Sequence, residues 1–472
     1  MRQLSVFNYF NGLVIALFVI ISAPLLFADG MFMDGTMYAG ISRNLAQGIG
    51  TIWNLHFSNT LMAEFHEHPP LMFWVQGIWF YVLGDSIYVE RMYSFVLFLI
   101  NAYFIQRLWI LLTNDTTTAF IPALLYVVVP VVTWSYSSNM IECTMTLFVL
   151  LSAYYMFKFI NNATNYWLVI LAGFFLYLAF MTKGFVALFV WGIPFFVWVV
   201  QQQKSMVVTA KHITLYVFFT IAPLLLMFVL IPNSYTCITS YINIQVVKSL
   251  QSVVTVDSRF FIVGKLLQEI IIAIIICAII IAVAYKKNIL QKLTTAHKQL
   301  VLLCLCIGLS GVLPIMVSQK QSGYYIVATY PFFAIALGII VQQYIHLFIQ
   351  HISNNMLYKK RLNAIVASIV AIAILVTLMQ YKRIGRDKEQ LTMVHQVCAI
   401  VPTGSTITID YAMYTDWALH AYLQRYGKLS LTENKKATNA YYLSETLQTL
   451  PNYAVVLRSS NYVLYKQVAH LN

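Results

Sequence analysis

Charged residues are scarce in this sequence. They make up 10% of its 472 residues, against 60% hydrophobic residues, whereas a soluble chain carries about 25% charge. Apolar runs of about 20 residues, the length that crosses a bilayer, recur from near residue 8 to near residue 380. Because a backbone in lipid must satisfy its own hydrogen bonds, these runs predict a helical membrane region.

Cysteine and internal repeats also contribute little. The six cysteines form no CxxC pair and lie mostly in or beside apolar runs, so we expect neither a disulfide framework nor a zinc site of that kind. The net charge of +13 could indicate nucleic-acid binding. Because the basic residues gather at the ends of apolar runs, we interpret them as orientation signals and contacts with membrane lipids, and we expect no nucleic-acid partner.

The apolar runs predict an all-α polytopic membrane protein with about 11–13 transmembrane helices. We place about eleven spans, near residues 8–28, 91–112, 118–134, 142–160, 166–182, 184–200, 212–231, 262–285, 299–318, 324–345 and 362–380. Residues 69–84 are apolar but shorter than a span and open with two prolines. We interpret this stretch as an interfacial helix with proline in its first turn.

Basic residues set the orientation of the spans. With residues 69–84 outside the membrane, one face receives Arg2, Arg107, Lys158, Lys204, Lys211, Lys286, Lys287, Lys292, Lys298, Lys359, Lys360 and Arg361. The other face receives Arg43, Arg91, Lys183, Lys248, Arg259, Lys265 and Lys320 before the tail. The positive-inside rule makes the first face cytoplasmic. The basic residues of 382–388, just after the last span, do not fit this rule.

Two parts of the chain are therefore expected outside the cytoplasm. One is the first extracytoplasmic loop, residues 29–90, with interfacial helices, and the other is a tail. The tail alternates like strands at 406–411, 440–443, 453–458 and 462–467 and has a helical pattern at 415–426. We predict a membrane domain over residues 1–380 and a small extracytoplasmic α/β domain over residues 381–472.

Acidic residues concentrate in these outer parts. Of the 16 acids, the first loop holds Asp29, Asp34, Glu64, Glu67, Asp85 and Glu90. Glu142 opens a span on the same face, so it can approach Asp34. A carboxylate there can deprotonate an acceptor hydroxyl or hold an acceptor amine. The alternative is an acid that only complements the positive end of the helix dipole.

Three cations also lie at outer span ends. Arg91 starts a span, Lys183 lies in Thr182-Lys183-Gly184 between two closely spaced spans, and Lys320 comes shortly before Tyr324 and Tyr325. Cations at this depth suit a phosphate at the lipid headgroup level. Each could instead be a snorkelling side chain, but three of them beside carboxylates favour a site for a phospholipid-like donor.

The segment from Glu64 to Pro70 has a His-x-His pattern flanked by glutamates. His66, Glu67 and His68 could bind a divalent metal, which is the one cofactor that the sequence suggests. The pattern is short and has no partner set, so a polar loop clamp is the preferred interpretation.

An ordered set of these residues resembles a known family. The set is Asp34-Gly35-Thr36-Met37-Tyr38-Ala39, Glu67-His68-Pro69-Pro70-Leu71, Gly84, Arg91, Glu142, Thr182-Lys183-Gly184, Lys320, Tyr324-Tyr325 and Pro331. It resembles the lipid A aminoarabinose transferases and the dolichyl-phosphate-mannose protein mannosyltransferases of the glycosyltransferase-C superfamily. The resemblance covers most of the membrane region and extends to a small extracytoplasmic tail domain.

The resemblance implies single-sugar transfer, with inversion, from a polyprenyl-phosphate donor on the outer face of a bacterial inner membrane. It implies Asp34 as the catalytic carboxylate, Glu142 as a second one, and Arg91, Lys183 and Lys320, with Tyr324 and Tyr325, as the donor-phosphate site. Tyr38 and residues 67–70 would form the first-loop motif. The acceptor would be a lipid or glycan such as lipopolysaccharide, with protein less favoured.

Three positions depart from the family pattern. The usual Asp-Glu is Asp34-Gly35 here, Met37 replaces an arginine, and His68 replaces a lysine before the proline pair. The sugar and acceptor therefore stay open. Two other functions also stay open: a flippase or transporter of a lipid-linked sugar, and a glycan polymerase or ligase with a pyrophosphate-linked donor. The sequence shows no inverted repeat of the kind that many transporters carry.

Overall fold

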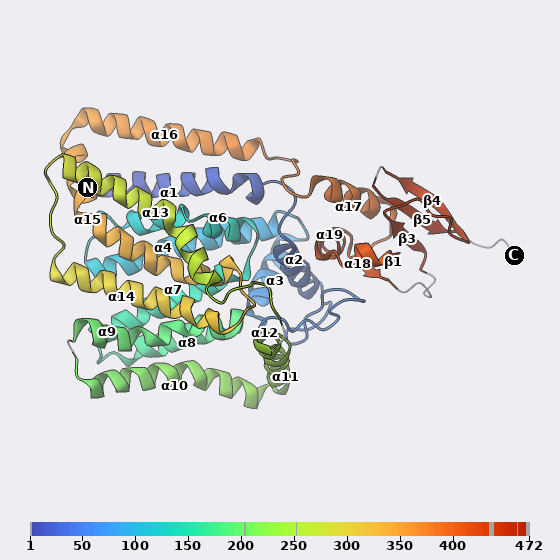
Figure 1. The fold of residues 1–472 in the computed structure, drawn as a ribbon, viewed down its shortest axis with the longest axis horizontal. Coiled ribbons are helices and arrows are strands. Elements are labelled where there is room, and N and C mark those ends of the chain that lie inside the picture. The colour runs from blue at the N-terminus through green and yellow to red at the C-terminus, as the bar shows by residue number, and fades with distance from the viewer. Residues whose placement is uncertain (1, 203, 252, 434–438, 460, 469–472) are drawn as a thin grey trace.

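The computed structural model describes residues 2–202, 204–251, 253–433, 439–459 and 461–468. A bundle of long helices is joined at one end to a smaller region of helices and strands (Figure 1). The long helices are α1 (Arg2–Leu26), α4 (Val89–Thr113), α7 (Ile141–Asn161), α8 (Tyr166–Lys183), α10 (Met206–Leu230), α13 (Phe261–Lys286), α14 (Thr295–Val312), α15 (Tyr330–Asn354) and α16 (Met356–Leu378).

Shorter helical segments connect them or lie across their ends. They are α2 (Met33–Ala46), α3 (Leu71–Leu83), α5 (Phe120–Val127), α6 (Pro130–Ser137), η1 (Gly184–Gly192), α9 (Ile193–Gln201), α11 (Pro232–Tyr241), η2 (Ile242–Val247), α12 (Lys248–Gln251), η3 (Leu313–Val317) and η4 (Gly323–Thr329). We call the end of the bundle that carries residues 27–88 and the C-terminal region the loop face.

Among the described residues, eight helices are long and apolar enough to cross a membrane, and the bent pair α5–α6 adds a ninth. The continuous stretch Tyr166–Gln201 counts once by this measure, but it turns back at Gly184. Lys183 pairs with Glu142 at the start of α7, whereas Lys204 donates to the carbonyl oxygen of Ile160 at the end of α7 (2.7 Å). The chain is thus a multi-pass membrane protein, in which α8 and η1–α9 run in opposite directions.

The predicted spans correspond to helices of the structure one by one. They match α1, α4, α5–α6, α7, α8, η1–α9, α10, α13, α14, η4–α15 and α16. The pair α5–α6 bends by 78° where Pro130 opens α6, since proline cannot continue a helix interior. Glu269 of α13 accepts a hydrogen bond from the Val131 N–H there (2.8 Å). This carboxylate satisfies a backbone donor that the bend exposes.

The apolar stretch 69–84 forms α3, which covers only Leu71–Leu83 and is too short to be counted as a span. Figure 1 places it beside α2 on the loop face. The predicted position of the proline pair is wrong, because Pro69 and Pro70 precede the helix and Pro70 is its N-cap residue. Both prolines are buried, so the pair fixes how the loop enters α3.

The C-terminal region contains α17 (Lys388–Ile400), β1 (Thr406–Ile409), α18 (Tyr411–Tyr414), α19 (Trp417–Gly427), β2 (Ser430–Thr432), β3 (Tyr441–Ser444), β4 (Tyr453–Arg458) and β5 (Val463–Gln467). The sheet order is β2-β1-β3-β5-β4, with β1 parallel to β2 and β3, and β5 antiparallel to β3 and β4. Ile407 lies opposite Leu431 on one side and Tyr441 on the other. The predicted strands and the helix at 415–426 are present, whereas α17 and β2 were not predicted.

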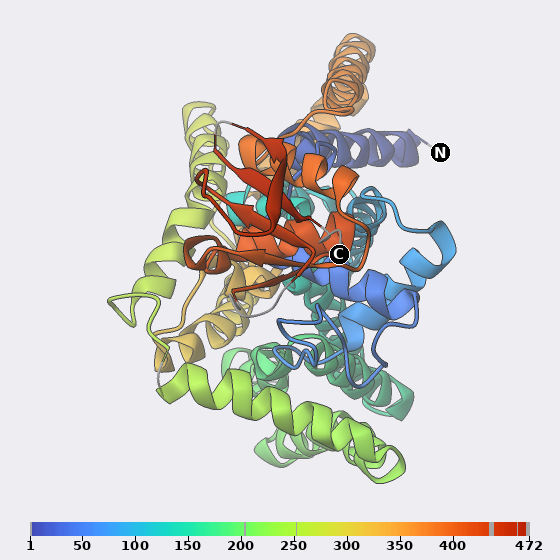
Figure 2. The same cartoon turned by 90° about the vertical axis from the view of Figure 1, so that its right-hand side faces the viewer.

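This region has its own hydrophobic core. Val394 of α17, Leu423 of α19 and Leu464 of β5 are fully buried in a cluster separate from that of the bundle. Figure 2, which looks onto the loop face, shows the region covering part of that face. Its contacts with the first loop are described below, because they reach the candidate site.

Candidate active site

An ion pair between Lys183 and Glu142 joins two spans at the loop face. Glu142 lies in the first turn of α7 and Lys183 in the last turn of α8, and Nζ of the lysine contacts Oε1 of the glutamate. The Glu142 side chain is fully buried and that of Lys183 is 8% exposed. A buried pair is weak support for stability, because well-packed apolar residues often serve as well. Buried charges inside a membrane region therefore point to function.

The turn after Lys183 requires glycine. Gly184 has φ +76°, and the hydroxyl of Tyr241 occupies the space where a Cβ would stand. The same hydroxyl donates a hydrogen bond to the carbonyl oxygen of Lys183 (3.3 Å). The Thr182-Lys183-Gly184 motif thus fixes the backbone that presents Lys183, and this explains the close spacing of the two spans.

Two tyrosines of η4 line the same site. The Lys183 Nζ lies 4.7 Å from the centre of the Tyr325 ring and 5.6 Å from that of Tyr324, within the range of a cation–π contact. The Tyr324 hydroxyl also donates to Oδ2 of Asp34 (3.4 Å). Tyr324 therefore connects the lysine with the first-loop carboxylate.

Asp34 lies in the first turn of α2. The pKa of its carboxyl is raised to about 6, chiefly by burial and also by the charges of Glu142 and Glu67, while Lys183 and the hydrogen bond from Tyr324 act in the opposite direction. A carboxyl group with such a pKa is poised to accept a proton near neutral pH. The structure thus brings Asp34, Glu142 and Lys183 together, although they are far apart in the sequence.

Gly35, a departure from the family pattern, has a structural reason. A Cβ at this position would overlap the carbonyl oxygen of Ser138. The side chain of Asn139 donates to the Gly35 carbonyl oxygen (3.0 Å). The first turn of α2 therefore packs directly on the backbone between α6 and α7, which leaves no room for the usual glutamate.

A second group of polar and charged side chains lies around Lys320. Its Nζ donates to Oε1 of Gln245 in η2 (3.0 Å). Burial raises the pKa of the Glu67 carboxyl above its usual value, and the charges of Lys320 and Lys248 offset only part of this rise. From the sequence, Lys248 is predicted only as an outer-face charge, and Gln245 is not predicted as a site residue. No helical apolar pattern marks this π-helical stretch, so its side chains gave no signal.

His68 lies between the two groups. Burial lowers the pKa of its imidazole well below the usual range, and the charges of Lys183 and Lys320 lower it further. Its Nε2 lies 3.0 Å from the hydroxyl of Tyr38, another residue of the first-loop motif. A neutral His68 therefore orients Tyr38 beside Asp34. Burial raises the pKa of the Tyr38 hydroxyl, and the charge of Asp34 raises it further.

The suggested metal site at His66, Glu67 and His68 is not formed. Within the described residues, no three histidine, cysteine, aspartate or glutamate side chains are placed to share a metal ion. His68 contacts Tyr38, Glu67 lies near Lys320, and the charge near His66 is that of Glu64. The three side chains thus serve different neighbours.

The placement of Arg91 in the phosphate site is also wrong. Its Nε donates to the carbonyl oxygen of Ala28 (3.1 Å), and its guanidinium pairs with Glu90 (3.3 Å) and lies 3.8 Å from Asp29. The side chain is buried among these groups, and within the described residues it makes no hydrogen bond or ion pair with Asp34 or Lys183. Arg91 belongs to the contact with the C-terminal region.

An apolar cavity of about 380 Å³ opens beside the cluster. Ile21 and Leu25 of α1, Trp134 of α6 and Ile272 of α13 are among its lining residues. The Trp134 ring stacks on the ring of Tyr324 at 5.6 Å. Trp134 thus links the lining of the cavity with the tyrosine that hydrogen-bonds Asp34.

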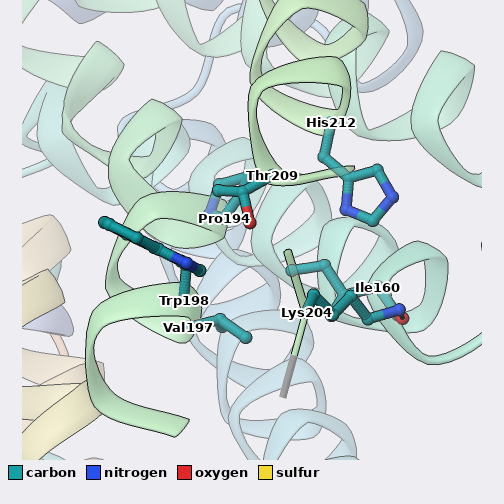
Figure 3. A pocket seen from close by; sticks show the side chains of 7 residues that line it. All are labelled: Ile160, Pro194, Val197, Trp198, Lys204, Thr209 and His212. Carbon is teal, nitrogen blue, oxygen red and sulfur yellow. Dashed lines mark hydrogen bonds between the residues drawn. The ribbon is translucent and has the colours of Figure 1, made fainter. Parts of the chain in front are cut away.

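A second pocket lies at the opposite end of the bundle and has no such chemistry. It holds about 10 Å³, room for one water molecule. Figure 3 shows Lys204 and His212 at its edge, with Trp198 on another side. Because Lys204 already donates to Ile160 (2.7 Å), this pocket is a packing defect near a helix end.

The chain is similar to known proteins in its fold and, over part of its length, in its sequence. The family model of dolichyl-phosphate-mannose-protein mannosyltransferases matches residues 67–231, which include His68, Glu142 and Lys183. Among curated proteins, none matches the sequence.

Solved structures are similar over nearly the whole chain. ArnT from Cupriavidus metallidurans bound to undecaprenyl phosphate has a TM-score of 0.67 at 14% identity, covering 97% of this chain and 98% of that chain. The same protein in the apo state has a TM-score of 0.63 at 12% identity, covering 96% and 97%. Archaeal oligosaccharyltransferase AglB from Archaeoglobus fulgidus, in complex with an inhibitory peptide and a dolichol-phosphate, has a TM-score of 0.54 at 11% identity, covering 93% and 69%. The chain therefore has the fold of the glycosyltransferase-C superfamily.

Proposed function

We propose that this protein is an inverting glycosyltransferase that moves a single hexose or pentose unit from a polyprenyl-phosphate donor to an extracytoplasmic acceptor. The observation that carries the proposal is the buried cluster of Asp34, Glu142 and Lys183 on a glycosyltransferase-C fold. The similar ArnT structure holds undecaprenyl phosphate, and AglB holds dolichol-phosphate. A lipid-linked phosphate is therefore the donor chemistry that we assign.

Lys183 and Lys320 would bind the donor phosphate. Both stand at the loop face, where the phosphate of a membrane lipid is found. Lysine is a point charge on a flexible stem, so Lys183 can turn from Glu142 to a phosphate without losing its charge. Phosphate is the leaving group, and charge stabilisation there can supply much of the rate.

Asp34 would act as the general base. As the bond between the anomeric carbon and the phosphate oxygen breaks, the acceptor oxygen or nitrogen forms the new bond from the opposite side. The acceptor proton passes to Asp34, and polyprenyl phosphate leaves with both bonding electrons. Glu142 pairs with Lys183, and its charge raises the pKa of Asp34, which favours proton uptake.

The proposal places the loop face outside the cytoplasm, in a bacterial inner membrane. Lys158 and Lys204 lie at the opposite end of the bundle, near the last turn of α7, and so do the basic clusters at 286–298 and 359–361. This bias matches the positive-inside rule. The apolar cavity beside Trp134 supports a lipid substrate; a lipid or glycan acceptor fits the site better than a protein.

The test compares transfer of radiolabelled sugar from polyprenyl-phosphate donors by the intact protein and by Asp34→Asn in membranes with matched expression. We expect transfer by the intact protein and a loss of about 10²–10⁴-fold in the variant. Asp257→Asn is the matched control, because Asp257 is an exposed acid whose backbone contacts Gln319 and which lies outside the cluster. It should transfer normally.

Other outcomes would replace parts of the proposal. Equal transfer by Asp34→Asn would move the base to Glu142. Transfer only from pyrophosphate-linked oligosaccharides would indicate a polymerase or ligase. Movement of labelled lipid across the bilayer without any transfer would make the protein a flippase.

A further inference from the structure

Helix α19 of the C-terminal region lies directly on α2, the helix that carries Asp34. Figure 1 shows α19 next to α2 at the loop face. The contact includes buried hydrogen bonds between residues that are 381 and 382 positions apart in the sequence. On its other side α2 packs on α3. The first loop is therefore held between the membrane helices and the C-terminal region.

The C-terminal region forms hydrogen bonds with the segment just before α2. The Asp29 N–H donates to the carbonyl oxygen of Arg383 (2.7 Å), and the Gly385 N–H donates to that of Asp29 (2.8 Å). The Asp29 carboxylate lies 2.8 Å from Nε2 of His395 and also accepts from the hydroxyl of Tyr426. The stretch that follows the last span thus docks on the loop through its backbone.

One side chain of α19 contacts the backbone just before α2. Tyr422 of α19 is fully buried, and its hydroxyl accepts from the Met31 N–H (3.3 Å). The hydroxyl proton can be donated to the Met31 carbonyl oxygen (2.7 Å) or to Oδ2 of Asp387 (2.8 Å). Both backbone groups of Met31 thus meet one hydroxyl, three residues before Asp34.

The other end of α2 is tied to the same helix. Arg43, in the last turn of α2, is buried and donates to the carbonyl oxygens of Gln424 (2.9 Å) and Arg425 (3.0 Å). These are carbonyls at the C-terminal end of α19, where a cation is favoured by the helix dipole. α19 therefore fixes the start and the end of α2, and rotation or sliding of α2 would break contacts at both.

We propose that Tyr422 is a positioning residue for Asp34, through which the C-terminal region holds the base against Lys183 and the acceptor. This inference rests on the proposed function for its catalytic meaning. Tyr422 touches no reacting atom; it acts on the backbone of Met31. A displacement of about 1 Å can lower a rate 10²-fold when a base must meet its proton.

The test uses Tyr422→Phe, which keeps the ring and removes the hydroxyl. Tyr442→Phe is the matched control, because its hydroxyl contacts Asp410 (2.6 Å) inside the C-terminal region and does not reach the loop. Two properties of the full-length protein are measured: hydrogen–deuterium exchange over residues 29–40, and kcat, KM and pH profile of sugar transfer from a polyprenyl-phosphate donor.

For Tyr422→Phe we expect faster exchange in residues 29–40, a kcat lower by about 10–100-fold and an unchanged KM for the donor. The pH midpoint of kcat should fall. Asp34 would move from its buried place beside Glu142, Glu67, Lys183 and Tyr324, and burial is the largest cause of its raised pKa. A merely structural role would reduce the folded fraction and leave the midpoint unchanged.

The role of Tyr422 in holding the loop and its role in positioning Asp34 can each be disproved without disproving the proposed function. If Tyr422→Phe exchanges no faster than Tyr442→Phe over residues 29–40, Tyr422 does not hold the first loop. Faster exchange with a normal kcat would show that Tyr422 holds the loop but does not position Asp34. If the intact protein transfers no sugar from any donor, the proposed function fails, and the exchange data still decide whether Tyr422 holds the loop.

Discussion

Two buried charged clusters lie near each other at the loop face, and they differ in how their charges are satisfied. In the first cluster Lys183 faces Glu142, whose Oε2 is buried and accepts no hydrogen bond within the described chain. In the second, Arg425 donates to Asp85 (2.8 Å), Glu90 (3.0 Å) and the carbonyl oxygen of Ser86 (2.9 Å). The first cluster leaves Oε2 of Glu142 unused, whereas all three nitrogens of Arg425 donate in the second. In that second cluster Nη2 of Arg91 lies 3.8 Å from Asp29 and makes no hydrogen bond within the described residues.

The difference separates a working site from a structural joint. Arginine holds several acceptors in a fixed planar arrangement, which suits a permanent contact between α19 and the first loop. Lysine can exchange one partner for another, which suits a site where a phosphate comes and goes. The candidate active site therefore differs from the joint in combining an unused acceptor, Oε2 of Glu142, with a cation that can change partners.

The largest expected effect comes from removing the exchangeable cation. Lys183→Met should lower transfer by about 10²–10³-fold or more, because the leaving phosphate loses its counter-charge. The melting temperature should change little in Lys183→Met/Glu142→Gln, since apolar or neutral groups can replace a buried pair. Transfer assays and thermal melts in detergent measure both.

Lys204→Met is the control for this prediction. Lys204 also donates from a span end, but to the Ile160 carbonyl oxygen at the opposite face (2.7 Å), and its replacement should leave transfer within about twofold. Normal transfer by Lys183→Met would remove Lys183 from the phosphate site and would erase the contrast between the clusters.

The second prediction breaks the structural joint. Arg425→Met leaves Glu90, which is 4% exposed, with only Arg91 as a partner. Removing one partner of a buried ion pair costs about 3–5 kcal/mol, so we expect a melting temperature lower by more than about 5 °C. Arg458→Met, on exposed β4, should melt like the intact protein. Equal melting of both variants would mean that the joint does not stabilise the fold.

Much of the membrane region could be predicted from sequence for a simple reason. A backbone in lipid must form helices long enough to cross it, so hydropathy marks each span. Asp34, Glu142, Lys183 and Tyr324 were found because each lies at or near the end of a span or in the first loop, and the positive-inside rule placed these ends on one face. The structure then brings them together.

Arg91 shows where such reasoning ends. It begins a span as Lys183 ends one, and nothing local distinguishes the two. Its cluster is completed by Arg425, 335 residues from Glu90, and by His395, 366 residues from Asp29. Partners at such separation lie in another layer of the fold, which apolar periodicity does not report. The same holds for β2, which is three residues long.

The third prediction uses pH to separate the clusters. The pKa of Asp34 is raised to about 6, chiefly by burial, so its basic form is lost as pH falls through that value. We expect kcat to fall about tenfold per pH unit below 6. Transfer measured in proteoliposomes between pH 4.5 and 8 checks this, and a flat profile would contradict a role of Asp34 as base.

The joint should survive that range. Burial raises the pKa of Asp29, but hydrogen bonds from His395 and Tyr426 and the charge of Arg91 lower it more, so that it lies below its usual 3.8. A carboxylate with a depressed pKa stabilises the fold above its unfolded pKa and loses this contribution only as pH falls through the folded value. Melting curves should therefore show no loss of this contact between pH 4.5 and 8.

The smallest expected effect concerns the two histidines of one motif. His66 is half-buried with only the charge of Glu64 near it, whereas His68 is buried and contacts Tyr38 (3.0 Å). His66→Ala should keep transfer within about twofold, and His68→Ala should lower it about tenfold, because Tyr38 loses its partner beside Asp34. A parallel titration with EDTA and Mn²⁺ tests whether the pair acts through a metal. Equal losses for both histidines, reversed by Mn²⁺, would restore the metal interpretation, since a shared ion would need both imidazoles, whereas a hydrogen bond to Tyr38 needs only one.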